Sequence, residues 1–275
     1  MSAITLQQIQ DDPDRKDIFG LLNEYIQPGS TTSASRAALS FAQGVKKPDE
    51  AFFWRFWDDV FDVAAQIRHD HPAQDRLVAF ARELALVPET GEKVWVSRVW
   101  TDLPLLGAAI RERLDKPPAP ASTNQDQNHA PPQVSFHAFV ARLLHAGVSP
   151  GSETTAIWML RDALEQPQPG KGKGKDASSD RDLMIAAMYI EYAGATLVQT
   201  LALQPGPRLD ESQRRILRGG ELWAGESGLT AARWAFWGRR FRERAGEQAT
   251  GQEAKDLALH AARLIEVWAQ TRLAT

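Results

Sequence analysis

The sequence predicts an all-α protein, a single multi-helix domain of about ten to eleven helices. Two observations predict this class. Apolar residues recur at helical spacing along nearly the whole chain, and only KVWVSRVW, from Lys93 to Trp100, could be a strand. At 275 residues the chain is also long enough to bury a sizeable core.

The individual helices follow from the positions of apolar residues and of residues that begin or end helices. Pro48 and Pro72 suit first helical turns, Asp102 can cap a helix that begins at LPLL, and Gly147 and Gly246 suit helix ends. In chain order, helices are expected at about residues 14–27, 32–44, 49–68, 73–87, 102–114, 134–146, 153–166, 180–203, 210–222, 230–247 and 252–271.

Two low-complexity stretches interrupt this pattern. Residues 115–133 and 166–180 are rich in Pro, Gly, Ser and Lys and contain almost nothing to bury. Both are expected to be flexible insertions in one helical domain that spans residues 1–275. The alternative is a two-domain chain divided near residue 125. The run PGKGKGKD lacks the first glycine and the final Ser/Thr of a phosphate-binding loop, so it is expected to be a solvated basic linker.

Composition excludes several classes of function. The formal net charge of −3 creates no field that attracts nucleic acid. The absence of cysteine removes disulfides, thiolate metal sites and a thiol nucleophile, and favours a reducing, cytoplasmic compartment. No secretory signal is apparent at the N-terminus. The apolar segment from Leu183 to Leu203 carries Glu191 near its middle, so a buried helix is expected and not a membrane span.

The segment WRFWDDVFD, residues 54–62, allows two interpretations. Asp58, Asp59 and Asp62 spell the D-D-x-x-D cluster by which terpene cyclases hold magnesium. On a helical wheel, however, they share the one polar strip of a mostly buried helix with Arg55. The second metal-binding element of such enzymes has no match in the chain. We therefore expect no metal and no cofactor, with magnesium-dependent prenyl chemistry as a weaker alternative.

An aromatic pattern occurs twice. W-x-F-W-x-x-x-F covers residues 54–61 and again residues 234–241, whereas the aspartates of the first copy have no counterpart in the second. What repeats is therefore expected to be packing. The second copy is rich in arginine, so the acidic strip could pair with it within or between subunits, which would make a homo-oligomer.

Glu191 is a lone charge in an apolar helix. Its neighbours one turn away are small or apolar, so we expect it to be buried and paired with Arg142 or Arg161. The competing interpretation is a pocket acid with a raised pKa, and Glu191 is then the candidate catalytic residue.

Several ordered blocks resemble a known family. FFWRFWDDVFDVAAQI, VWTDLPLLGAAIRERLD, FHAFVARLLHAGV and ELWAGESGLTAARWAFWGRRF, among others, are similar to a filamentous-fungal family catalogued as a domain of unknown function, over about residues 50–270. The resemblance implies a fungal, intracellular, helical protein with relatives in secondary-metabolite gene clusters. It implies no catalytic residue.

The leading functional hypothesis combines this resemblance with the nine tryptophans. An aromatic helical protein could enclose an apolar small molecule, and could convert it without a cofactor by cyclisation or isomerisation. The alternative is a protein-interaction or scaffold module without catalysis, which uses its charged helix faces and has no pocket. The candidate substrate-binding residues are Trp57, Trp100, Trp158, Tyr192, Trp223 and Trp237.

Overall fold

The computed structural model describes residues 3–7, 13–115, 131–149, 151–167, 175–202 and 208–272. Within these ranges the predicted all-α class is confirmed: eleven helices form, and the only strands make one short hairpin. The chain divides into two compact units, residues 1–149 and 150–275, each of which is described by itself. This division lies later than residue 125, and the single domain stays a prediction.

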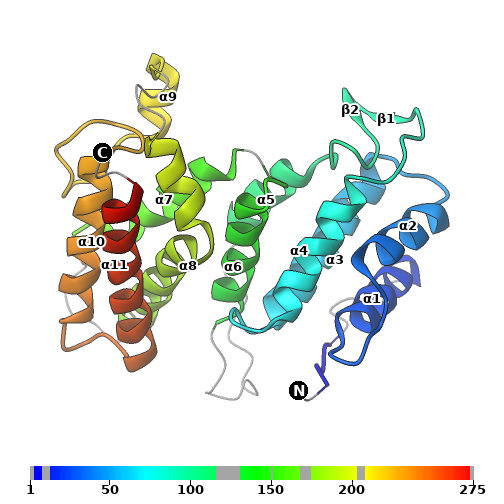
Figure 1. Cartoon of the computed structure of the whole chain (residues 1–275), viewed down its shortest axis with the longest axis horizontal. Coiled ribbons are helices and arrows are strands. Elements are labelled where there is room, and N and C mark those ends of the chain that lie inside the picture. The colour runs from blue at the N-terminus through cyan, green and yellow to red at the C-terminus, as the bar shows by residue number, and fades with distance from the viewer. Residues whose placement is uncertain are drawn as a thin grey trace. The chain divides into compact units, whose positions relative to one another are not determined.

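Unit 1 holds six helices and the hairpin (Figure 1). Its elements are α1 (Pro13–Ile26), α2 (Ala34–Gly44), α3 (Glu50–Gln66), α4 (Ala73–Leu84), β1 (Lys93–Val94), β2 (Ser97–Arg98), α5 (Leu106–Asp115) and α6 (Pro132–His145). Asp49 caps α3 by accepting the Phe52 N–H at 2.9 Å. Helix α3 contacts α1, α4, α5 and α6, so it is the central helix of the unit.

The core of unit 1 is aromatic and centres on α3. Phe53, Phe56, Trp57 and Phe61 are fully buried on this helix. Trp100, which follows the hairpin, packs its ring 5.4 Å from that of Phe53. Aromatic pairs at such distances add to the free energy of burial. The strand predicted at residues 93–100 is thus a hairpin followed by a core residue.

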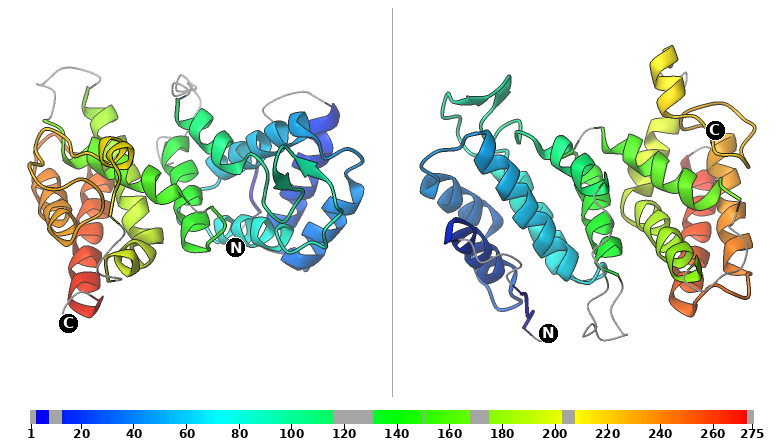
Figure 2. Two further views of the ribbon diagram at one scale, coloured as in Figure 1. Left: turned by 90° about the horizontal axis from the view of Figure 1, so that it is seen from above. Right: turned by 180° about the vertical axis from the view of Figure 1, so that it is seen from behind.

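Unit 2 holds the remaining five helices of the described ranges. They are α7 (Ser152–Leu164), α8 (Lys175–Ala202), α9 (Glu211–Ile216), α10 (Ala231–Ala245) and α11 (Gln252–Arg272). Helix α8 contacts α7, α10 and α11, and α10 also contacts α7 and α11. Figure 2 shows α10 and α11 side by side in both views.

Glycines bring the helices of unit 2 close together. A Cβ on Gly238 would lie 2.9 Å from the Ile265 Cγ2 atom, and one on Gly194 would lie 3.1 Å from the Trp268 Nε1 atom. Gly238 occupies the place that Asp58 has in the first copy of the aromatic pattern, so close helix packing replaces the carboxylate there. Trp57, Phe61, Trp237 and Phe241 are all fully buried, so packing repeats at two of the four aromatic positions. At the other two the copies differ, because Trp54 and Phe236 are partly exposed whereas Trp234 and Phe56 are buried.

Three helix boundaries differ from the predicted ones by about four residues or more. Helix α5 begins at Leu106 and not at Asp102, because Leu103 and Leu105 take positive φ angles of 44° and 64°. Helix α9 ends at Ile216, where a loop begins that the prediction treated as helix to residue 222. Helix α8 begins at Lys175, inside the predicted insertion 166–180. Most of the predicted insertion 115–133 and residues 168–174 lie outside the described residues.

None of the helices in the described ranges combines the length and the apolar character that a membrane crossing requires.

Candidate functional site

The hairpin of unit 1 presents apolar side chains to solvent. Its strands pair Lys93 with Arg98 and Val94 with Ser97, which leaves Trp95 and Val96 as the two residues of the turn. Trp95 is 66% exposed and Val96 is 89% exposed. These two residues are called the hairpin tip below. Figure 1 shows the hairpin projecting beyond the ends of the neighbouring helices of its unit.

The backbone on the C-terminal side of the hairpin is strained. Trp95, Trp100, Leu103 and Leu105 all have positive φ angles, between 44° and 66°. Bulky residues rarely adopt this conformation, which costs about 1–2 kcal/mol per residue. Such strain persists only where surrounding contacts fix the chain, and it concentrates at functional sites. This segment is therefore a candidate functional segment of unit 1.

Two sets of contacts fix the strained segment. Arg98 pairs with Asp102 at 2.7 Å and with Glu89 at 2.7 Å, and its backbone N–H also donates to Asp102. The pKa of Asp102 is lowered, chiefly by its hydrogen bonds from Arg98. Asp102 was predicted to cap a helix, and this is wrong because the carboxylate closes the hairpin instead. At the other end, the indole N–H of Trp57 donates to the carbonyl of Pro104 at 2.8 Å.

Trp95 is also held in place by its side chain. Its indole N–H donates to the Glu50 carboxylate at 2.9 Å, so the hairpin tip is tied to the first residue of α3. The bond positions the indole while most of the ring stays in water. An aromatic side chain held in this way loses little further freedom when a partner covers it.

A shallow cleft lies further along the same helix. It has a volume of about 300 Å³, is open to solvent, and is lined by Trp54, Arg55 and Asp58 of α3 and by Ala109 and Glu112 of α5. These five residues are called the α3–α5 cleft below. Trp54 is one turn after Glu50, so the cleft and the hairpin tip follow one face of α3.

The three aspartates of the D-D-x-x-D segment do not act together. Asp62 pairs with Arg113 at 2.7 Å, Asp59 is buried, and Asp58 lines the cleft. Among the described residues, no group of three or more His, Asp or Glu side chains is placed to hold a metal ion. The three aspartates therefore do not form such a group, and the magnesium alternative gains no support from their positions.

Three of the predicted substrate-binding aromatics belong to the packed core. Trp57, Trp100 and Trp237 are at most 1% exposed. Protein groups accept the indole N–H of two of them: Pro104 for Trp57, and Glu165 for Trp237. All three are thus packed in the core of their units, and the α3–α5 cleft contains none of them.

The other three predicted aromatics are partly exposed in unit 2. Trp158 donates its indole N–H to the Ile216 carbonyl at 2.9 Å, and Trp223 donates to the Glu226 carbonyl at 3.0 Å. Tyr192 lies on α8. None of these three lines the α3–α5 cleft. The cleft's own aromatic residue, Trp54, was not among the predicted site residues.

The predicted burial and pairing of Glu191 are wrong. Glu191 is exposed and its carboxylate lies 2.7 Å from His260 of α11. Arg142 pairs with Asp75 at 2.8 Å, and Arg161 pairs with Asp162 at 2.8 Å. The small neighbours of Glu191 did indicate a close helix contact: Gly194, one turn later, lies against Trp268 of α11, the helix that also carries His260. A catalytic role for Glu191 stays a prediction.

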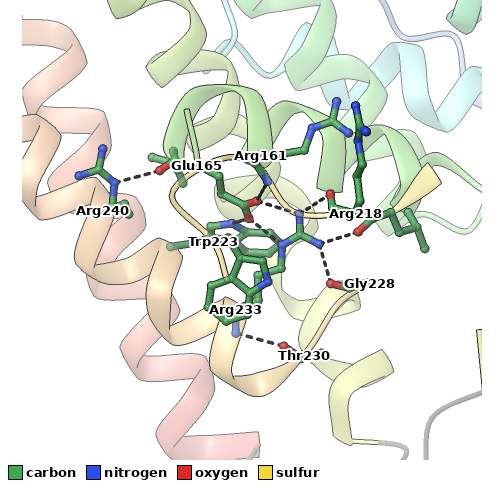
Figure 3. Close-up of polar contacts among 12 residues, drawn as sticks. Arg161, Glu165, Arg218, Trp223, Gly228, Thr230, Arg233 and Arg240 are labelled. Atoms are coloured by element: carbon green, nitrogen blue, oxygen red, sulfur yellow. Dashed lines mark hydrogen bonds and ion pairs between the residues drawn. The ribbon is translucent and has the colours of Figure 1, made fainter. Parts of the chain in front are cut away.

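The buried ion pair of unit 2 involves two residues that the sequence analysis did not single out. Glu165, directly after α7, and Arg233 of α10 are both 0% exposed and meet at 2.6 and 3.0 Å. The Glu165 carboxylate also accepts the Trp237 indole N–H and the Gly220 backbone N–H. Figure 3 shows the carboxylate and the guanidinium facing each other beneath the loop that carries Trp223.

Arg233 also fixes the loop between α9 and α10. Its guanidinium donates to the carbonyls of Leu217, Arg218 and Gly228 at 2.8–3.2 Å. Because the pair is closed to solvent and its hydrogen bonds end on the protein itself, it holds the fold together and does not form a reactive site. The signal in the sequence was an arginine directly before Trp234 and four residues before Trp237, on the aromatic side of the helix.

Two further arginines of α10 bind the end of α7. Arg240 donates to the Leu164 carbonyl at 2.9 Å and Arg244 to the Ala163 carbonyl at 3.0 Å. With Arg233 they are spaced seven and four residues apart, which places all three on one helix face. Positive charge at the C-terminal end of a helix is stabilising. These three arginines therefore stabilise unit 2 itself, and the pairing of the arginine-rich helix with the acidic strip of α3 stays a prediction.

Substitutions at Trp95 can measure the strain. Trp95→Ala and Trp95→Gly both lose the bond to Glu50, but only alanine keeps a Cβ at the φ angle of 55°. The left-handed backbone costs alanine about 1–2 kcal/mol, and the extra freedom of unfolded glycine offsets about 0.4–1 kcal/mol. We expect the glycine variant to be the more stable of the two by about 0.5–1 kcal/mol in urea unfolding. Equal stability would show that the turn is not strained.

Comparison with known proteins gives a family and no function. A family model described as a protein of unknown function (DUF3632) matches residues 57–241, more than half of the chain. The match contains the hairpin, the α5 side of the cleft and the Glu165–Arg233 pair. No curated protein and no solved structure matches the chain.

Proposed function

The chain belongs to this DUF3632 family of proteins of unknown function, and we propose that it is a protein-interaction module that binds a partner through the hairpin tip without catalysing a reaction. The observation that carries the proposal is the exposure of Trp95 and Val96, at 66% and 89%, on a strained and pinned turn. Soluble proteins gather exposed apolar side chains mainly where another molecule covers them.

The composition of the hairpin tip supports a protein partner. Tryptophan is among the residues most enriched at the energetic centres of protein interfaces, and a rigidly presented ring loses little entropy on binding. The neighbouring α3–α5 cleft continues the same face with one aromatic and three charged residues. An apolar centre beside charged groups is the usual arrangement of a protein interface.

The hypothesis of an apolar small-molecule site is less well supported. It relied on six aromatic residues as pocket walls, of which three are packed core and three lie elsewhere than the described cleft. Glu191, its candidate acid, lies on the surface beside His260. The interaction module therefore ranks first.

The proposal predicts that partner capture depends on the hairpin tip. Full-length protein is immobilised and incubated with a lysate of its own source cells, and the retained proteins are quantified by mass spectrometry. We expect at least one protein retained by the wild type to be reduced about tenfold or more by Trp95→Ser/Val96→Ser, since loss of a central interface residue costs about 2 kcal/mol or more.

The control variant changes an exposed valine to serine outside the hairpin tip. Val267 of α11 is 48% exposed, and Val267→Ser removes an exposed apolar side chain from unit 2 by the same type of substitution as Val96→Ser. Capture by this variant should equal that of the wild type. If the tip variant, folded by circular dichroism, retained every partner at wild-type levels, the hairpin tip would not be the binding site.

A further inference from the structure

We propose that the α3–α5 cleft receives a single positively charged side chain, a lysine or an arginine, from a peptide segment of the partner. This inference rests on the proposed interaction function and specifies the chemistry of its occupant. Four observations carry it: the size of the cleft, its aromatic wall, the sign of its charge and its continuity with the hairpin tip.

The size fits one long side chain. A volume of about 300 Å³ lies at the lower limit of small-molecule pockets, and the cleft is open on its solvent side. Ala109, one of its α5 residues, is 6% exposed and has the smallest side chain of the five. A long, thin side chain that enters from solvent can therefore lie along the cleft while its backbone stays outside.

The aromatic wall suits a cation. Trp54 is only partly buried, in contrast to Trp57 on the same helix. Tryptophan is the best ring partner for a lysine or arginine, because its face is electron-rich and attracts positive charge within about 6 Å. Asp58 lies one turn after Trp54 on the same face, so a cation over the ring has a carboxylate beside it.

The residues that line the cleft carry more negative than positive charge. Asp58 and Glu112 supply two carboxylates and Arg55 supplies one guanidinium. Both carboxylates have contacts within the chain, but an ionised carboxylate offers about four acceptor positions and can bind a further donor. Arg55 also acts on Asp49, whose pKa is lowered first by the hydrogen bond from Lys47 and to a smaller extent by the charge of Arg55.

The cleft begins one helical turn after Glu50, the residue that holds the hairpin tip. Glu50 accepts the Trp95 indole N–H at 2.9 Å, and Trp54 follows it by one turn of α3. A helical turn rises about 5.4 Å, less than the reach of two extended residues. One short peptide can therefore cover the tip with an apolar side chain and place a basic side chain in the cleft.

The test uses peptide probes of defined charge on the full-length protein. The probe is acetyl-Leu-Arg-Leu-amide, and the matched controls carry glutamine or glutamate in place of arginine. The readout is the indole N–H resonance of Trp54, which Trp54→Phe assigns by its disappearance. We expect a saturable shift with the arginine peptide, affinity lower by about tenfold or more for both controls, and weaker binding at higher salt.

Two variants test which carboxylates of the cleft attract the arginine side chain of the peptide. Glu112→Gln, and the double variant Asp58→Asn/Glu112→Gln, should weaken the arginine peptide by about three-fold and about tenfold or more, with unchanged circular dichroism. Equal affinity for the three peptides, no shift of Trp54 at about 10 mM peptide, or wild-type affinity in Glu112→Gln would each overturn the inference. If the double variant does not fold, the three-peptide comparison on the wild type decides the question.

The outcome is separable from that of the proposed function. Loss of captured partners in the hairpin-tip variant together with no charge preference at Trp54 would retain the interaction module and remove the cation site. Charge-selective binding at Trp54 with unaltered capture by the tip variant would retain the cation site and remove the hairpin tip as the binding centre.

Discussion

Replacing Arg233 by methionine is expected to lower the free energy of unfolding by about 3–5 kcal/mol, because it leaves the Glu165 carboxylate buried without its counter-charge. Three loop carbonyls, of Leu217, Arg218 and Gly228, lose a donor in the same step. Methionine matches the length of the arginine stem, so the loss comes mainly from charge and hydrogen bonds. Urea unfolding followed by circular dichroism measures it.

A second arginine of the same helix supplies the control. Arg242 pairs with Glu266, but both side chains are about half exposed. Exposed pairs contribute about 0–1 kcal/mol, so Arg242→Met should leave the unfolding midpoint nearly unchanged. A loss below about 1 kcal/mol for Arg233→Met would mean that water or a rearranged loop replaces the pair, and that it does not hold unit 2 together.

The second large effect is expected at Trp57. Trp57→Ala removes a fully buried indole from the centre of unit 1 and should cost about 3–5 kcal/mol. The Pro104 carbonyl also loses the indole N–H that it accepts at 2.8 Å, which releases the C-terminal end of the strained segment. We therefore expect lower stability together with faster amide hydrogen exchange in residues 95–105.

Trp54→Ala, three residues earlier on the same helix, is the matched control. Trp54 is partly exposed and lines the α3–α5 cleft, so its removal should cost about 1 kcal/mol or less. A near-neutral Trp57→Ala would contradict the assignment of Trp57 to the core. Equal losses at the two positions would show that Trp54 supports the fold and does not present a binding surface.

Helical periodicity was sufficient to predict the class and the order of the helices. All eleven predicted helices have a counterpart in the described ranges, because burial on one face imposes a spacing that is readable without tertiary information. The predicted helix boundaries were wrong where residues far away in the sequence determine where a helix ends. Helix α9 stops at Ile216 because Arg233 holds the carbonyls of Leu217 and Arg218 in the following loop, from 16 and 15 residues later in the sequence.

The candidate site was less predictable, for a physical reason. The sequence predicted a buried carboxylate at Glu191, which is exposed. It did not predict the fully buried Glu165, which lies beside a proline-rich stretch that suggested solvent. Which face of a helix is covered depends on its neighbours, and the sequence of that helix alone does not contain this information. The exposure of Trp95 could not be predicted either. An alternating apolar segment does not reveal which of its residues form the turn.

Site-specific photo-crosslinking from position 96 tests the interaction function most directly. Val96 is replaced by p-benzoylphenylalanine in the full-length protein within its source cells, and Val267 carries the same group in a parallel control. The account predicts a discrete cross-linked protein band from position 96 that is absent from position 267 and is lost when Trp95→Ser is added. No band from position 96, or the same band from both positions, would contradict a binding surface at the hairpin tip.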